Sequence, residues 1–134
     1  MLMCGAWREE TMTKAIVEIP RAGEYFERAL EVARRADAGE VLPEADYHLG
    51  FANAAQLFAE LTPARLALLE ALKGLGATSL DALAKHLGRD YSMVHADTTK
   101  LLDLGLMEKT PEGLVWVPWE EVQIRLTLGK AKAA

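Results

Sequence analysis

Six polar side chains between positions 89 and 100 are of the types that contact nucleic acids. They are Arg89, Tyr91, Ser92, His95, Thr99 and Lys100. On a helix that begins at Asp90, positions 91, 92, 95 and 99 share one face, and the apolar residues of the helix lie opposite. An arginine fork fits a guanine edge or a phosphate, and a lysine neutralises a phosphate. The spacing therefore predicts an exposed helix face that contacts DNA bases and phosphates.

A structural interpretation of the same side chains stays open. Arg89 could form a salt bridge with Asp90 or Asp97, because its planar fork also fits a carboxylate. The whole face could also be solvated without contacting any partner. We favour DNA contact because the polar groups gather at the start of one helix, where recognition helices contact bases.

No other group of residues predicts a catalytic or cofactor site. The three histidines, His48, His86 and His95, lie in different segments, without the spacing that places two metal ligands on one helix. The single Cys4 has no second cysteine for a disulfide or a thiolate metal site. The sequence lacks a glycine-rich phosphate loop and the HExxH and GxSxG motifs. We therefore expect no enzyme activity, no metal and no cofactor.

The aromatic residues near position 118 allow two interpretations. Trp116 and Trp119 flank Pro118 and could stack on bases. Packing against the helices or a partner subunit is the simpler explanation, because buried tryptophan contributes a large apolar area. His48 is expected to make a local hydrogen bond.

The elements that would position the polar face follow the order of a winged helix-turn-helix. Thr62 and Pro63 predict a helix start, as an N-cap and a first-turn proline. Ser79 is expected to cap the next helix and Gly88 to end it. Three helices and a β-hairpin are predicted in this order: 62–75, 79–87, 90–104 and 106–118. In that motif the third helix enters the major groove and the hairpin forms the wing.

The segment before these helices is predicted to hold one strand and two helices. β-branched residues over Lys14–Ile19 predict a strand that ends at Pro20. An amphipathic helix is predicted from position 23 to 39, with an apolar face of Phe26, Ala29, Leu30 and Ala33. Positions 41–49, which include Pro43, are expected to be extended. Asn53 then caps a short helix to Leu61 that is expected to bury Ala54, Leu57 and Phe58.

The ends of the chain are predicted to be a strand and two tails. Alternating apolar residues predict a C-terminal strand that turns four side chains inward: Val122, Ile124, Leu126 and Leu128. Residues 129–134 are expected to be a solvated tail. Residues 1–12 are expected to be a disordered or non-native tail, because Met12 could equally be the true start.

Composition limits the class of protein further. The 134 residues, 51% hydrophobic, can form one domain with a real core. The net charge is −5, and residues 1–61 carry 11 acidic against 6 basic residues. This balance argues against strong non-specific DNA affinity but allows a small basic face. The longest uncharged stretch, 47–59, is shorter than the ~20 residues of a membrane span, so we expect no membrane segment and a cytoplasmic protein.

The predicted fold class is α+β, mostly helical with a small β part. We expect four segments: the tail 1–12, a dimerisation or docking segment 13–61, the winged helix-turn-helix 62–118, and the C-terminal strand and tail 119–134. The winged helix does not itself need the two apolar strands at the chain ends. Because unpaired strand edges pair with other chains, the sequence predicts a homodimer.

The winged-helix segment resembles the MarR- and ArsR-like regulators over residues 62–118. Over residues 13–128 the chain is similar to a prokaryotic family of small DNA-binding proteins. The matching pieces are EYFERALEVARRADAGE, PEADYHLGF, QLFAELTPARLALLEAL and LAKHLGRDYSMVHADTTKLLDLGL. The resemblance implies a transcription regulator, antitoxin-like, that binds double-stranded DNA. Ser92, Met93 and Ala96 stand where that family often has basic or amide residues.

The same fold also permits a function without DNA. A winged helix can keep its architecture while its acidic N-terminal half binds a protein, for example a basic, toxin-like partner. The salt dependence of binding to DNA and to candidate proteins would distinguish the two functions.

Overall fold

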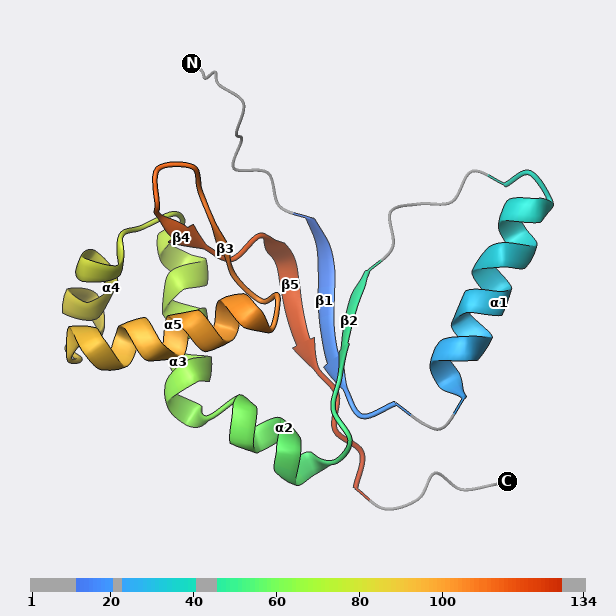
Figure 1. Ribbon diagram of the computed structural model, residues 1–134, viewed down its shortest axis with the longest axis horizontal. Helices are drawn as coiled ribbons and strands as arrows, with labels where there is room; N and C mark the ends of the chain where they lie inside the picture. Colours follow the sequence, from blue (N-terminus) through green and yellow to red (C-terminus); the bar gives the residue numbers. More distant parts are fainter. Residues whose placement is uncertain (1–11, 21–22, 41–45, 129–134) are drawn as a thin grey trace.

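A three-stranded parallel sheet joins the N-terminal and C-terminal segments in the computed structural model of the protein, which describes residues 12–20, 23–40 and 46–128. The order of the strands is β2 (Tyr47–Gly50), β1 (Met12–Glu18) and β5 (Trp119–Ile124). Figure 1 shows this sheet between the helices α3–α5 and the separate helix α1. The predicted tail 1–12 is wrong at its last residue, because Met12 begins β1 and pairs with Trp119. Residues 1–11 of that tail, the tail 129–134 and positions 41–45 of the extended stretch lie outside the described residues.

The central strand β1 is buried on both of its faces. Ala15 and Val17 face the core, as a strand at this position predicts, but Ile16 and Glu18 on the other face are buried as well. The reason is topological: a central parallel strand has a neighbour on each side, whose side chains flank its own. Ile16 lies opposite His48 of β2 and Gln123 of β5.

The prediction that the two apolar strands at the chain ends lack a partner within the chain is wrong. Strand β5 pairs with β1 in parallel, with Ala15 opposite Val122 and Val17 opposite Ile124. Parallel pairing requires a long crossover, and the whole winged-helix segment supplies it. The argument for a dimer from unpaired strands is therefore removed.

The C-terminal strand also occupies a different range from the predicted one. It begins at Trp119 and ends at Ile124, so residues 125–128 lie beyond it. Val122 is half-buried, whereas Ile124 and Leu128 are exposed. The Arg125 amide still donates a 2.8 Å hydrogen bond to the Val17 carbonyl. Beyond it the alternating pattern runs past the end of β1, where the described part of the chain provides no strand to pair with it.

Helix α1 (Glu24–Asp37) forms where the amphipathic pattern predicted a helix, with Glu24 and Glu27 in its first turn and basic residues in its last. Its apolar face, however, does not enter the core. Phe26 is 67% exposed and Leu30 45% exposed, and every residue from 29 to 40 is exposed. Figure 1 shows α1 beside the sheet, away from α3, α4 and α5.

Helix α2 (Ala54–Glu60) is capped by Asn53, whose side chain accepts a 2.8 Å hydrogen bond from the Gln56 amide, as predicted. Leu57 is fully buried, but Phe58 is exposed, contrary to expectation. Leu57 and Leu61 are one turn apart and take the inward positions, and Phe58 lies about 100° around the helix.

The order of elements in the following segment is the predicted one. It contains α3 (Pro63–Leu75), α4 (Leu80–Leu87), α5 (Tyr91–Asp103), β3 (Glu108–Lys109) and β4 (Val115–Trp116). Thr62 and Ser79 cap α3 and α4, accepting hydrogen bonds from the amides of Arg65 and Ala82. Gly88 ends α4 in the left-handed conformation, at φ 65°. The strands β3 and β4 pair as an antiparallel hairpin, and Thr78 adds a bridge to Val115.

A hydrophobic core connects the sheet, helices α2–α5 and the hairpin, and the fold class is α+β, as predicted. Its fully buried side chains include Val17, Leu57, Leu68, Leu72, Leu83, Val94, Leu101, Leu106 and Val115. Trp116 and Trp119 are both buried, in agreement with the packing interpretation. No helix within the described ranges is long and apolar enough to cross a membrane.

Tyr47 and Trp119 fix the sheet to the C-terminal end of α5. Their rings stack with centroids 5.2 Å apart and an interplanar angle of 10°. The Tyr47 hydroxyl donates a 2.8 Å hydrogen bond to the Leu104 carbonyl, and the Trp119 indole N–H donates one of 3.0 Å to the Gly105 carbonyl. The orientation of α5 is therefore set by the sheet as well as by α3 and α4.

Candidate nucleic-acid interface

The outward face of α5 carries the four side chains that the helical spacing of the sequence predicted on it. Tyr91, Ser92, His95 and Thr99 are all exposed. On the opposite side of the helix the buried residues are Val94, Thr98 and Leu101. The face is therefore accessible along two turns, at the N-terminal half that a recognition helix presents to the major groove.

Two residues of this face were not among the predicted contacts. Met93 is 59% exposed, and Ala96 is exposed next to it. For Ala96 the helical spacing already indicated this, because Ser92, Ala96 and Thr99 lie at i, i+4 and i+7. Since neither side chain carries a hydrogen-bonding group, they could contact only apolar parts of a base, such as the thymine methyl group.

The hydroxyls of the α5 face are held by local hydrogen bonds. Thr99 Oγ1 donates to the His95 carbonyl at 3.0 Å, and Ser92 Oγ donates to the Asp90 carboxylate. Asp90 precedes α5 as predicted, but its carboxylate makes no capping bond to the helix backbone. A hydroxyl that donates one hydrogen bond keeps acceptor capacity, so both side chains could still accept from a base amino group.

Arg89 is held by Asp97, the second of its two predicted salt-bridge partners. Its Nη2 atom lies 2.7 Å from Asp97 Oδ2, while Arg65 Nε lies 3.0 Å from Asp97 Oδ1. Arg65 also donates to the Glu60 carbonyl at 2.8 Å. Burial alone raises the pKa of Asp97, but hydrogen bonds from Arg89 and Arg65 outweigh it and hold that pKa below its ordinary value.

This cluster joins α3, α5 and the turn between α4 and α5. The Asp97 carboxylate is 14% exposed and the Arg89 side chain 24% exposed, so the guanidinium is not displayed on the surface. To bind a guanine or a phosphate, Arg89 would have to leave Asp97, which would keep Arg65 as its counter-ion. The Arg89 Nη1 atom is buried and has no hydrogen-bond partner within the described part of the chain.

Lys100 also has a carboxylate partner. Its Nζ atom lies 2.7 Å from Glu60 Oε1, with the lysine side chain 39% exposed and the glutamate 29% exposed. The pair ties α5 to the end of α2. Because a partly exposed ion pair contributes little stability, about 0 to 1 kcal/mol, Lys100 could exchange Glu60 for a phosphate at small cost.

The charge around α5 is nearly balanced rather than basic. On α4, Lys85 is well exposed and lies 3.1 Å from Asp81, one turn earlier. Lys109 is exposed on β3. Asp90 and Asp103 are exposed at the two ends of α5. The available cations could contact phosphates, but they do not form the broad basic surface that gives high non-specific affinity.

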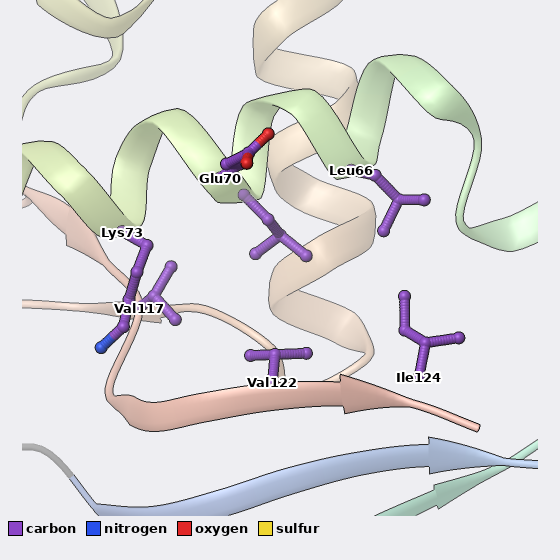
Figure 2. Close-up of a pocket in the computed structure, with 7 residues that line it drawn as sticks. Leu66, Glu70, Lys73, Val117, Val122 and Ile124 are labelled. Atoms are coloured by element: carbon purple, nitrogen blue, oxygen red, sulfur yellow. The ribbon is translucent and has the colours of Figure 1, made fainter.

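A concave site lies outside α5, among the described residues. Figure 2 shows a pocket of about 390 Å³ between α3 and β5. It is lined by Leu66, Leu69, Glu70, Lys73, Val117, Val122 and Ile124. Lys73 Nζ, at its edge, donates a 2.6 Å hydrogen bond to the Trp119 carbonyl. The size and apolar lining suit a small apolar molecule, but the pocket does not include the α5 face.

The histidines do not gather at a metal site. His48 Nδ1 lies 2.6 Å from Glu18 Oε2 on the neighbouring strand β1, so its partner is 30 residues away and not local as expected. Across residues 12–20, 23–40 and 46–128, no group of three His, Cys, Asp or Glu side chains is placed to hold a metal ion.

The described residues define an α+β fold in which three helices are followed by a β-hairpin, which is the element order expected of a winged helix-turn-helix. Residues 60–124 match the model of the HVO_A0114 family. The matched segment runs from the last residue of α2 to the end of β5. It covers helices α3–α5, the β3–β4 hairpin and strand β5, which is just under half of the chain. No curated protein and no solved structure matches the chain significantly.

Proposed function

We propose that the protein is a sequence-specific DNA-binding transcription regulator, antitoxin-like in type. In this proposal α5 enters the major groove and the β3–β4 hairpin is the wing. The observation that supports it is the arrangement of α4, a three-residue turn and α5, whose N-terminal half displays side chains outward. The proposal needs no cofactor and no catalytic group, and it places the protein in the cytoplasm.

The proposed contacts divide into two kinds. Tyr91, Ser92, His95 and Thr99 would contact base edges or nearby phosphates, since their side chains are exposed at the start of α5. Arg89 and Lys100 would bind DNA by leaving the carboxylates that hold them. DNA phosphates would then compete with the Asp97 and Glu60 carboxylates for these two cations.

The balanced charge of the α5 region predicts a modest and salt-dependent affinity. With about three or four phosphate contacts per subunit, counterion release gives a log–log salt slope of about −3 for one subunit and about −5 to −7 for a two-fold dimer. A slope in this range would come from a small set of cations rather than from the whole acidic chain.

Arg89→Ala and Lys100→Ala separate base contact from phosphate contact. If Arg89 forms two hydrogen bonds with a guanine, Arg89→Ala should cost about 1 to 3 kcal/mol and relax the preference at one base pair. If Lys100 binds a phosphate, Lys100→Ala should weaken binding to every sequence alike and flatten the salt slope by about one unit. The probe is the best duplex selected from a random library by the wild-type protein, measured by fluorescence anisotropy.

Arg125→Ala is a suitable control because Arg125 is an exposed arginine just after β5, outside the α5 face. It should leave affinity and base preference unchanged. If Arg125→Ala weakens binding as much as Arg89→Ala does, only the total charge matters and the proposed role of α5 is wrong.

Protein docking is the second candidate function, and the ion pairs of Arg89 and Lys100 favour it. A face whose cations are held by carboxylates and whose exposed side chains include Tyr91 and Met93 also suits a protein partner. The acidic N-terminal half would match a basic, toxin-like partner. Equal, weak affinity for the selected duplex and for random DNA would favour this candidate.

A further inference from the structure

Helix α1 presents a continuous apolar stripe to solvent. Phe26, Leu30 and Ala33 are spaced at i, i+4 and i+7. All three are exposed, Phe26 at 67%. A 14-residue helix is marginal in water without packing, so a stripe of this kind is expected to be covered in the folded protein.

The charged side of α1, not its apolar stripe, faces the rest of the chain. Arg28 Nη2 lies 2.9 Å from Glu18 Oε2 on β1 and 2.6 Å from Glu24 Oε2 on its own helix. Burial alone lowers the pKa of Arg28, but the hydrogen bonds and charges of Glu18 and Glu24 outweigh it and raise that pKa. On the helix, Arg28 lies well away from the apolar stripe, so this anchor turns the stripe outward.

Over the described strand residues, the chain's own sheet offers little apolar surface to match the stripe. The face of the sheet turned away from the core carries mainly polar side chains. By the strand register these include Lys14, Glu18, His48, Glu121 and Gln123, with the apolar Ile16 among them. Burying Phe26 and Leu30 against this face would desolvate polar groups without apolar contact in return.

The charges that border the stripe point to a second copy of the same helix. Glu27 and Arg34 are two turns apart, so both border the stripe on the same side. In an antiparallel helix pair, the same flank of each helix faces its counterpart. Glu27 of each copy would therefore lie beside Arg34 of the other, and the acidic first turn would lie beside the basic last turn.

We infer that α1 is a self-association element, which pairs antiparallel with the α1 helix of a second copy about a two-fold axis near Leu30. Within its own chain, Arg34 Nη1 lies 3.5 Å from Glu31 Oε1, and both side chains are more than half exposed. Because such an exposed ion pair is weak, Arg34 can exchange Glu31 for Glu27 of the other copy. The inference does not rest on DNA binding.

The inferred interface is small. One pair of 14-residue helices buries less than the ~1,200 Å² of a stable interface. We therefore expect a dissociation constant on the order of 10 μM. The dimer should be visible by sedimentation velocity, in the absence of DNA, between about 5 and about 200 μM protein.

Leu30→Glu tests the position of the interface. It places two carboxylates at the centre of the pair and should raise the dissociation constant at least tenfold, while the circular dichroism of the fold is unchanged because Leu30 is exposed. Phe58→Glu on α2 is the matched control, since Phe58 is similarly exposed outside α1, and it should sediment like the wild type. A monomeric wild type at the highest concentration, or dissociation by Phe58→Glu but not by Leu30→Glu, would overturn the inference.

A charge exchange tests the orientation of the helices. Glu27→Arg alone places a second guanidinium against Arg34 of the other copy, and Arg34→Glu alone places two carboxylates together. Each single change should weaken the dimer severalfold, and the double change should restore it. If the double variant dimerises as weakly as the single variants do, the antiparallel pairing is ruled out.

Discussion

Asp97 stabilises the start of the proposed recognition helix by binding two arginines at once. The carboxylate receives Arg65 of α3 and Arg89 of the preceding turn, and it is mostly buried between them. The cluster therefore sets the position of the side chain on which we place the guanine contact. From the sequence alone, Arg89 had two possible carboxylate partners as well as DNA, because local spacing does not determine a contact with α3.

Asp97→Asn should lower the free energy of unfolding at pH 7 by about 1 to 3 kcal/mol, because it removes the charge that holds both arginines. The pKa of Asp97 is lowered in the folded state. Its stabilisation is thus complete above the unfolded value near pH 4 and is lost as the pH falls through the folded value. Thermal melts of wild type and variant should therefore converge as the pH falls below about 4.

Asp103→Asn is the control for this series. Asp103 is an exposed carboxylate at the other end of α5, and its loss should change stability by less than about 0.5 kcal/mol. Identical melting temperatures of Asp97→Asn and wild type at pH 7 would contradict the stabilising role of the cluster.

Thr98 is a buried residue whose hydroxyl has no hydrogen-bond partner among the described residues. Valine has nearly the same shape and removes the unpaired group. Thr98→Val should raise the free energy of unfolding by roughly 1 kcal/mol. Thr99→Val, at an exposed neighbour, should leave it nearly unchanged. Chemical denaturation of both variants gives the comparison, and destabilisation by Thr98→Val would show that the hydroxyl is paired in solution.

At the scale of elements, the end of α5 is held by a close approach at Gly105. Its φ is +81°, and a Cβ built there would lie 2.8 Å from the Tyr47 hydroxyl oxygen. Gly105→Ala should therefore cost about 1 to 3 kcal/mol, from both the left-handed backbone and the steric contact. Gly39→Ala has a similar φ of +83° with no atom within 4 Å, so it measures the backbone cost alone.

A Tyr47→Phe background isolates the steric contact. Tyr47→Phe alone should cost about 1 kcal/mol, since it removes the hydrogen bond to Leu104. The further cost of Gly105→Ala should then be smaller than in the wild type, because the hydroxyl oxygen is gone. Strictly additive costs in the double variant would show that Tyr47 and Gly105 do not meet.

The local elements could be predicted from the sequence, whereas their partners could not. Thr62, Ser79 and Gly88 carry their signals within a few residues, because caps and left-handed stops depend on neighbouring backbone groups. Strand β5 gives only an alternating pattern, which specifies an inward face but not the strand beside it. Its pairing with β1 is a contact across the whole winged helix, and for that reason the prediction of unpaired strands failed.

The candidate site shows the same division. Helical spacing was sufficient to predict that Tyr91, Ser92, His95 and Thr99 share an exposed face, since that follows from the period of the helix. It could not reveal that Lys100 binds Glu60, because that contact joins α5 to another helix. The sequence therefore predicts which side chains are displayed but not which cations are already neutralised.

At the scale of the whole molecule, the sheet, the winged helix and α1 have separate roles. The sheet fixes the end of α5 through Tyr47 and Trp119. Helix α1 lies beside the sheet, on the side away from α3, α4 and α5 (Figure 1), and its apolar stripe is exposed. If α1 pairs two copies, two α5 helices would be carried by one two-fold dimer. Such a dimer would bind two half-sites, most simply about 34 Å apart on the duplex.

The most direct test of the central claim is the affinity of the full chain for its best selected duplex and for random duplex DNA, measured at about 50 mM and about 200 mM salt. The account predicts tighter binding to the selected duplex at both salt concentrations. It also predicts that this preference is reduced by Arg89→Ala and that affinity falls with salt along a slope of about −3 per subunit. Equal and weak affinity for both duplexes, unaffected by Arg89→Ala, would contradict DNA recognition by α5.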